Sequence, residues 1–500
     1  MDLNADLSQL RDRIEGNAAD FGLDFYKVIF EMLDYRTMNA VAAYEGFPTR
    51  YPHWRFGMEY ERLSKSYAYG LHRIYEMVIN TDPCIAYLLV SNELVDQKLV
   101  IAHVFGHSDF FKNNLWFAHT NRKMLDEMAN HAARIRRYIE KYGHDTVETF
   151  LDACLSLENL IDVHRAGEEE LSGRSPGGAA PEPGEVEEHK FPSKGYMDSF
   201  INPPEYLEAQ ARRRKEEESR QKQNPPQPER DVLRFILENA PLETWQHDVL
   251  EIVREESYYF APQRQTKIMN EGWAVFAHTH IMTGYALEPN ELIDYADHHS
   301  GTVAISPGRL NPYKLGYELF LDIEDRWNRG AFGPAYGACD DFEQRRRWDL
   351  GLGLGRSKVF EVRRIYNDVG FIDEFMTEDF VRQHNLFGFD YNPQTSLYEI
   401  STRDYAEIKR RLIFQLTNFG HPVIEVVDGN FENRGELCLA HRYEGTPLDI
   451  PWAEETLRSL YALWGRPVNL ETVLDGDQRV RLRFGPGGNT REELDEAPEE

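Results

Sequence analysis

The sequence has few cysteines, no long apolar run and fewer basic than acidic residues, and each shortage excludes a class of protein. Four cysteines are scattered over 500 residues without a CxxC pair, which argues against a disulfide scaffold and against a zinc knuckle. No stretch approaches the roughly 18 consecutive apolar residues that a membrane span requires. Lys and Arg total 56 against 85 Asp and Glu, a net charge of −29, which disfavours general binding to nucleic acid or anionic lipid.

The N-terminal segment also lacks the pattern of a secretory signal, which is a basic region followed by an apolar region. We therefore expect a cytoplasmic protein. Hydrophobic residues make up 41% of the chain, enough for a sizeable core, and the length suits about two to four domains.

Changes in composition and period predict five regions. Residues 1–164 form a mainly helical domain, and residues 231–389 form a second helical half. Between them, residues 165–230 are rich in proline and mixed charge, which is typical of a disordered linker or insertion. Residues 390–486 form a small α+β domain, and residues 487–500 form a disordered acidic tail.

Local sequence patterns predict the helices and strands inside these regions. Phe25–Leu33 carries helical apolar spacing, whereas Ile85–Val90 suits either a strand or the start of a buried helix. From about residue 390 the order is β-α-β-β-α-β-β, which predicts a ferredoxin-like arrangement for the C-terminal domain.

A histidine pair supplies the first candidate site. His103 and His107 are four residues apart, so on a helix both imidazoles share one face and can reach one metal ion. A chain with 17 histidines contains about 0.6 such pairs by chance, so the spacing alone also suits two core or capping histidines. Polar residues beside large apolar ones in the following HSDFFKNN segment favour a lined cavity.

A second apolar segment, MNEGWAVFAHTH, supplies a carboxylate. Glu271 and His278 are two turns apart on one helical face. A carboxylate on so apolar a helix is paired, metal-bound or at the surface edge, and an exposed or N-terminal position is the alternative. His103, His107 and Glu271 together make a His₂Glu set, the ligand type of catalytic zinc sites, and predict a mainly α, zincin-like helical core.

The motif departs from zinc peptidases at one position. In HExxH the internal Glu is the general base, and here Val104 occupies that position. Asp109 is a candidate substitute, although it points elsewhere on an ideal helix. His278 is the better candidate for a fourth ligand, an outer partner or a proton-transfer group.

Five long blocks resemble the SpoVR family, the stage V sporulation protein R-like proteins. The resemblance covers nearly the whole chain except the 165–230 insertion and the acidic tail. The blocks are HWRFGMEYERL (53–63), HVFGHSDFFKNN (103–114), YYFAPQRQTKIMNEGWA (258–274), NPYKLG (311–316) and RRIYNDVGFIDEFMT (363–377).

The resemblance implies a link to spore cortex formation, or to stress and stationary-phase physiology in bacteria that form no spores. It implies a PrkA-type serine kinase and a YhbH/YeaH-type protein as partners, and it carries no settled reaction. The positions that match the family motifs are His103, His107 and Glu271, with His278 beside them.

Three functions follow as hypotheses. The leading one is a metal-dependent hydrolase of amide or peptide bonds that uses a divalent ion, zinc before iron or manganese. The second is a non-enzymatic metal-binding regulator or scaffold. The third is redox chemistry, because two histidines and a carboxylate also form the iron facial triad.

Overall fold

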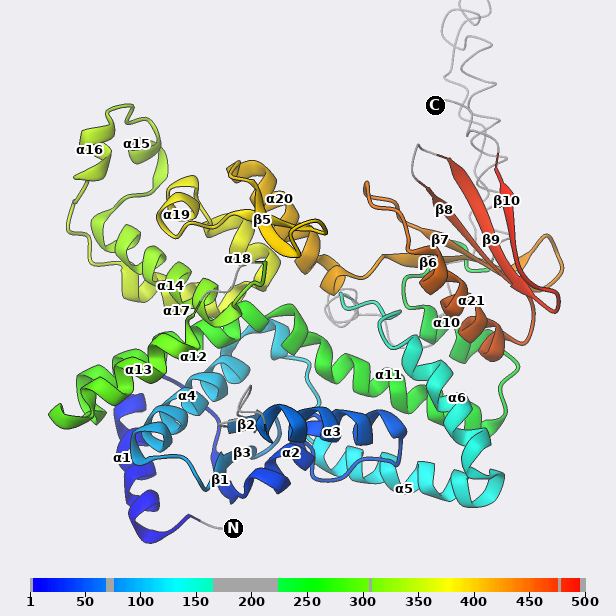
Figure 1. Cartoon of the computed structure of the whole chain (residues 1–500), viewed down its shortest axis with the longest axis horizontal. Helices are drawn as coiled ribbons and strands as arrows, with labels where there is room; N and C mark the ends of the chain where they lie inside the picture. Colours follow the sequence, from blue (N-terminus) through cyan, green and yellow to red (C-terminus); the bar gives the residue numbers. More distant parts are fainter. Residues whose placement is uncertain (1–2, 69–75, 165–223, 305–307, 475–477, 495–500) are drawn as a thin grey trace, which may run out of the picture. The chain divides into compact units, whose positions relative to one another are not determined.

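The computed structural model describes residues 3–68, 76–164, 224–304, 308–474 and 478–494 (Figure 1). These residues form two compact units, each built from two stretches of the chain. The first unit comprises Met1–Lys141 and Tyr259–Gly420, and the second comprises Tyr142–Tyr258 and His421–Glu500. Most of the predicted insertion, residues 165–223, lies outside the described residues, as do residues 495–500 of the predicted tail.

The first unit is mostly helical, as predicted. Its longer helices are α1 (Ala5–Phe21), α2 (Tyr35–Ala43), α3 (Trp54–Ala68), α4 (Leu94–Asn113), α5 (Met124–Tyr142), α12 (Lys267–Ile281), α13 (Leu292–Thr302), α14 (Pro312–Arg329), α17 (Gly355–Ile365), α18 (Asp368–Phe375), α19 (Glu378–Gln383) and α20 (Tyr405–Leu416). No helix among the described residues has the length and apolar character needed to cross a membrane.

Helices α4 and α12 form the centre of this unit, and α14 packs against α12 (Figure 1). Nearly every residue of α4 from Val95 to Phe111 is buried, and so is most of α12. A helix that is buried on all faces must lie inside a core, so the polar side chains that these two helices carry are buried with them. Both histidines and the glutamate of the candidate site belong to this set.

A small sheet accompanies these helices and corrects one prediction. Strands β1 (Val28–Leu33), β3 (Cys84–Leu89) and β2 (Glu76–Ile79) lie in the order β1-β3-β2. The predicted helix at Phe25–Leu33 is wrong, because Val28–Leu33 pairs in parallel with Cys84–Leu89. This pairing joins segments far apart in the chain and outweighs the local spacing. The ambiguous Ile85–Val90 run is the strand β3.

The C-terminal sheet belongs to the second unit. Strands β6 (Ile424–Phe431), β7 (Glu436–His441), β8 (Val468–Val473), β9 (Arg479–Gly485) and β10 (Gly488–Glu493) follow one another in sequential order. Helix α21 (Ile450–Trp464) makes the crossover between β7 and β8, which are parallel, and the other neighbours are antiparallel. Helices α6 (His144–Ser156) and α10 (Val232–Asn239) complete this unit, and α11 (Thr244–Gln265) contains the boundary between the units.

One detail of the predicted C-terminal domain and one of the predicted tail are wrong. The first predicted strand is β5 (Leu397–Thr402), which pairs with β4 (Gly388–Asn392) in a separate two-stranded sheet. The five-stranded sheet is therefore sequential and not ferredoxin-like. Residues 488–493 of the predicted disordered tail form β10, because a glycine-rich turn lets them pair with β9 as a hairpin.

Two glycines allow the central helices to approach closely. A Cβ atom at Gly106 of α4 would lie 2.8 Å from the Cα atom of Ala274 on α12. A Cβ atom at Gly272 of α12 would lie 2.4 Å from the backbone of Gly316 on α14. Backbone cannot yield as a flexible side chain does, so these contacts require glycine.

We predict that Gly272→Ala destabilises the first unit by about 1–3 kcal/mol, because the added methyl group forces α12 and α14 apart. The control is Gly57→Ala in α3, where a Cβ atom meets nothing within 4 Å. There the substitution should be neutral or stabilise by up to about 1 kcal/mol, because alanine favours helix. Thermal unfolding followed by circular dichroism measures both, and equal stability of the two variants would contradict the packing argument.

A buried carboxylate in the second unit makes the stability of this unit depend on pH. Glu436 of β7 accepts hydrogen bonds from Arg434 (2.9 Å), Arg483 (3.1 Å) and Asn469 (3.1 Å). Burial opposes ionisation, but these donors outweigh it and lower the pKa of Glu436 to about 2. A folded-state pKa below the unfolded one gives stability that is present at neutral pH and is lost as pH falls through the folded value.

Glu436→Gln should therefore destabilise the second unit at pH 7, and its difference from the wild type should shrink as pH falls from about 4.5 to about 2. The control is Glu432→Gln, because Glu432 also pairs with Arg434 but is more exposed. This substitution should change the stability of the second unit little at any pH in this range. Thermal unfolding over this pH range is the measurement. A difference that does not vary with pH would show that Glu436 is not held ionised.

Candidate metal centre

His103 and His107 lie one turn apart on α4, as their spacing predicts. Their ring centroids are 4.6 Å apart, and both residues are buried, with 3% and 5% of their surfaces exposed. The helix therefore presents two imidazoles on one face within the core. Polar groups in such a place need partners, since burial without a partner is costly.

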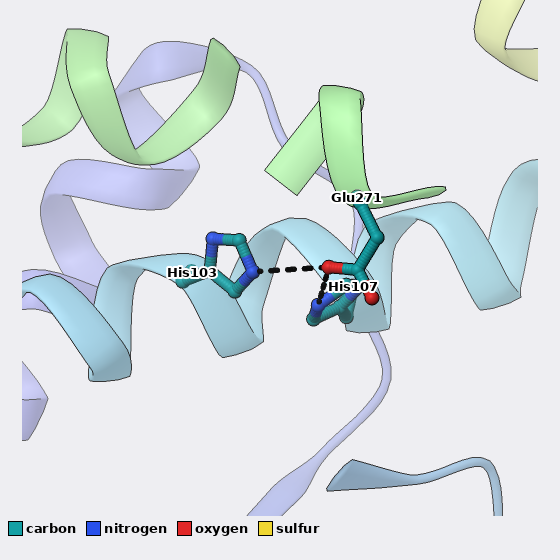
Figure 2. A group of neighbouring side chains, drawn as sticks. All are labelled: His103, His107 and Glu271. Carbon is teal, nitrogen blue, oxygen red and sulfur yellow. Dashed lines mark ion pairs between the residues drawn. The ribbon is translucent and has the colours of Figure 1, made fainter. Parts of the chain in front are cut away.

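Glu271 of α12 faces both imidazoles (Figure 2). Its Oε2 atom lies 3.6 Å from Nε2 of His103 and 3.5 Å from Nε2 of His107. One potential ligand atom from each of the three residues lies within 4.8 Å of the other two. The structure thus brings Glu271 to His103 and His107, although Glu271 lies more than 160 residues further along the chain.

The spacing of these atoms suits a shared metal ion better than direct hydrogen bonds. Two ligand atoms about 2.0–2.1 Å from a tetrahedral zinc ion are roughly 3.3 Å apart, close to both observed separations. Oε2 of Glu271 is buried and accepts no hydrogen bond. A buried carboxylate oxygen without a hydrogen-bond donor suits contact with a cation, so the three residues fit a divalent metal ion.

The other ring nitrogen of each histidine has a partner of its own. Nδ1 of His107 lies 2.9 Å from the amide oxygen of Asn270, to which it donates its proton. Nδ1 of His103 lies 2.9 Å from Nδ1 of His278. Such outer partners orient ligand imidazoles and leave Nε2 for the metal. His278 therefore contacts His103 from outside the converging group, and the role in proton transfer or ligation predicted for it stays a prediction.

Burial and charge set the protonation of the group. Burial lowers the pKa of His107 to about 4 and holds the pKa of His278 well below its usual range, so both rings are neutral near pH 7. Burial alone would raise the pKa of Glu271, but Lys267 and the two imidazoles outweigh it and hold that pKa below its usual range. A neutral imidazole and a carboxylate are the forms in which His107 and Glu271 can bind a metal ion.

Lys267 holds the second oxygen of the carboxylate. Its ammonium group lies 2.6 Å from Oε1 of Glu271, one helical turn away on α12. The Lys267 side chain is 57% exposed, whereas that of Glu271 is 7% exposed. The exposed ammonium group of Lys267 therefore contacts the buried carboxylate of Glu271 from the solvent side.

The structure places Asp109, a predicted catalytic residue, in a different network. Its carboxylate accepts hydrogen bonds from the Trp273 indole (2.8 Å) and the Asp24 backbone (2.7 Å), and it lies 3.1 Å from Nε of Arg363. Burial raises the pKa of Asp109 to about 6 against the effect of Arg363. These contacts join α4 to α12 and α17, and Asp109 is not one of the three residues that converge.

Val104, at the position of the HExxH base, is fully buried and has no ionisable group. The arrangement therefore offers candidate metal ligands without the usual base.

Sequence reasoning missed Asn270 and Lys267. Both carried a signal, because Asn270 precedes Glu271 within the motif and Lys267 lies four residues before it on the same helix face. Their roles depend on which atoms of His107 and Glu271 face them, which only the packing of the two helices decides.

Comparisons with known proteins agree with the resemblance. Residues 2–421 match the family model described as SpoVR like protein, and residues 422–475 match the SpoVR-like C-terminal domain. The chain is 31% identical over 487 residues to the uncharacterized protein YcgB of Escherichia coli (strain K12), covering 90% of this chain and 88% of that protein. No solved structure matches significantly. The end of the first match falls at the boundary between the units, Gly420 and His421.

We predict that Asn270→Leu weakens metal binding about 10- to 100-fold, because His107 loses the acceptor that fixes its ring. Thr279→Val, a nearly isosteric change at a half-buried position of the same helix, is the control and should leave the affinity unchanged. Competition with a chromophoric chelator measures both. Equal affinity of Asn270→Leu and wild type would show that Asn270 does not orient the ligand.

Proposed function

We propose that this chain, which belongs to the SpoVR-like protein family, binds a divalent metal ion through His103, His107 and Glu271 and hydrolyses an amide or peptide bond there. The observation that carries the proposal is the buried Oε2 atom of Glu271, which has no hydrogen-bond donor and faces two imidazole nitrogens. Zinc is the ion to test first, because a His₂Glu set is the ligand type of its catalytic sites.

The ligand number supports a catalytic rather than a closed site. Among the described residues, no other His, Cys, Asp or Glu joins the three that converge. Structural zinc sites use four protein ligands, whereas catalytic ones keep a position for water or substrate. When bound, the ion would polarise a carbonyl group and lower the pKa of bound water to about 7.

The chain's own residues would orient these ligands. Asn270 fixes the ring of His107, His278 contacts His103, and Lys267 holds one oxygen of Glu271. The likeness to zincins that we propose extends to the ligand set alone, because Val104 cannot accept a proton. A peptide, or the peptide part of a cell-wall precursor, is the substrate class that the family's association with the spore cortex suggests.

A non-enzymatic metal-binding regulator is the second candidate. Two observations favour it: the base position holds Val104, and each of the three ligands has less than a tenth of its surface exposed. Iron-dependent redox chemistry is a further candidate, since the same ligand set can bind Fe²⁺, and the identity of the metal separates it from hydrolysis.

Elemental analysis of untagged protein tests the metal site. We expect near-stoichiometric metal in the wild type, and its loss in His103→Ala and Glu271→Ala. His280→Ala, on α12 but outside the converging group, is the matched control and should retain the metal. Wild-type protein that binds no zinc, manganese or Fe²⁺ after reconstitution would contradict the proposal.

Hydrolysis needs its own assay. Zinc-loaded wild type and His103→Ala should be incubated with a peptide library and with cell-wall precursor peptides, and the products identified by mass spectrometry. Cleavage by the wild type alone supports the hydrolase. Metal binding without cleavage would overturn the hydrolytic part and favour the regulator.

A further inference from the structure

The two oxygens of Glu271 have different surroundings. Oε2 faces the imidazoles of His103 and His107, whereas Oε1 lies 2.6 Å from the ammonium group of Lys267. A carboxylate that binds a metal through both oxygens fills two coordination positions. With Oε1 held by an ammonium group, Glu271 has one oxygen left to offer.

This contact opposes tight metal binding. The ammonium charge lies one hydrogen bond from a ligand carboxylate, so it repels a divalent cation and reduces the negative charge that Glu271 can offer. A site that only stores a metal gains nothing from such a neighbour. A catalytic site, in contrast, benefits from this lysine. The lysine leaves a coordination position open, and the reduced charge of Glu271 leaves the ion more electrophilic.

We propose that Lys267 restricts Glu271 to one coordinating oxygen and thereby keeps a position on the metal open for substrate or water. Lys267 is a positioning residue in this role, because it acts through Glu271. The inference rests on the metal site proposed above. It favours a catalytic over a storage or structural role for that site.

A similar pair on the neighbouring helix provides a control. Lys314 and Glu318 of α14 are also four residues apart, with Nζ and Oε1 separated by 3.4 Å. Neither belongs to the converging group. Lys314→Met therefore removes a lysine from a lysine–glutamate pair without touching the proposed ligands.

Cobalt substitution tests the proposal, because four-coordinate Co²⁺ absorbs visible light far more strongly than five- or six-coordinate Co²⁺. We expect intense bands in the wild type and in Lys314→Met. In Lys267→Met, Oε1 is released to the ion, so the bands should weaken while zinc affinity rises roughly tenfold. Lys267→Arg keeps the charge and should restore the wild-type spectrum and affinity.

The outcomes separate this inference from the metal site itself. Wild-type protein that binds no Co²⁺ would overturn the metal site and with it the inference. Wild-type binding with an unchanged Lys267→Met spectrum and affinity would overturn the inference alone. Circular dichroism checks that Lys267→Met is folded. If the folded variant binds zinc more weakly than the wild type, Lys267 only supports local structure, and the inference is overturned.

Discussion

The contact between helices α4 and α12 determines the rest of the candidate centre. Gly106 lets the backbone of Ala274 approach closely, and it immediately precedes the candidate ligand His107. At this separation Glu271 reaches both imidazoles of α4 from the facing helix. A larger residue at Gly106 would separate the helices, and a shift of about 1 Å is enough to spoil a metal or catalytic site.

Other buried polar contacts hold these helices in register. Asp109 of α4 binds the Trp273 indole of α12, and Asp368 accepts hydrogen bonds from the backbone N–H groups of Ile268 and Met269 at 2.8 Å each. Asp368 thus satisfies donors at the N-terminus of α12 that would otherwise lack partners in the core. Buried polar groups of this kind seldom add stability, so their presence here fits a centre whose geometry must be fixed.

The sequence was sufficient for features that depend on local spacing. The shared face of His103 and His107 follows from four-residue spacing on a helix, and Glu271 was predicted because a carboxylate on so apolar a helix needs a partner. The strand at Val28–Leu33 and its pairing with β3 depend on contacts between distant segments, which local spacing cannot show. For the same reason Asn270 and Lys267 were missed: their partners become known only once α4 and α12 are packed.

The most direct test of the central claim is X-ray absorption spectroscopy of untagged wild-type protein, at the edge of whichever metal elemental analysis detects in it. This measurement reports the atoms that surround the ion without assuming a substrate. The account predicts two imidazole nitrogens and one carboxylate oxygen near 2.0–2.2 Å, as for zinc bound by His and Glu, plus a light atom in the open position. A shell containing sulfur, or lacking the signature of two imidazoles, would contradict it.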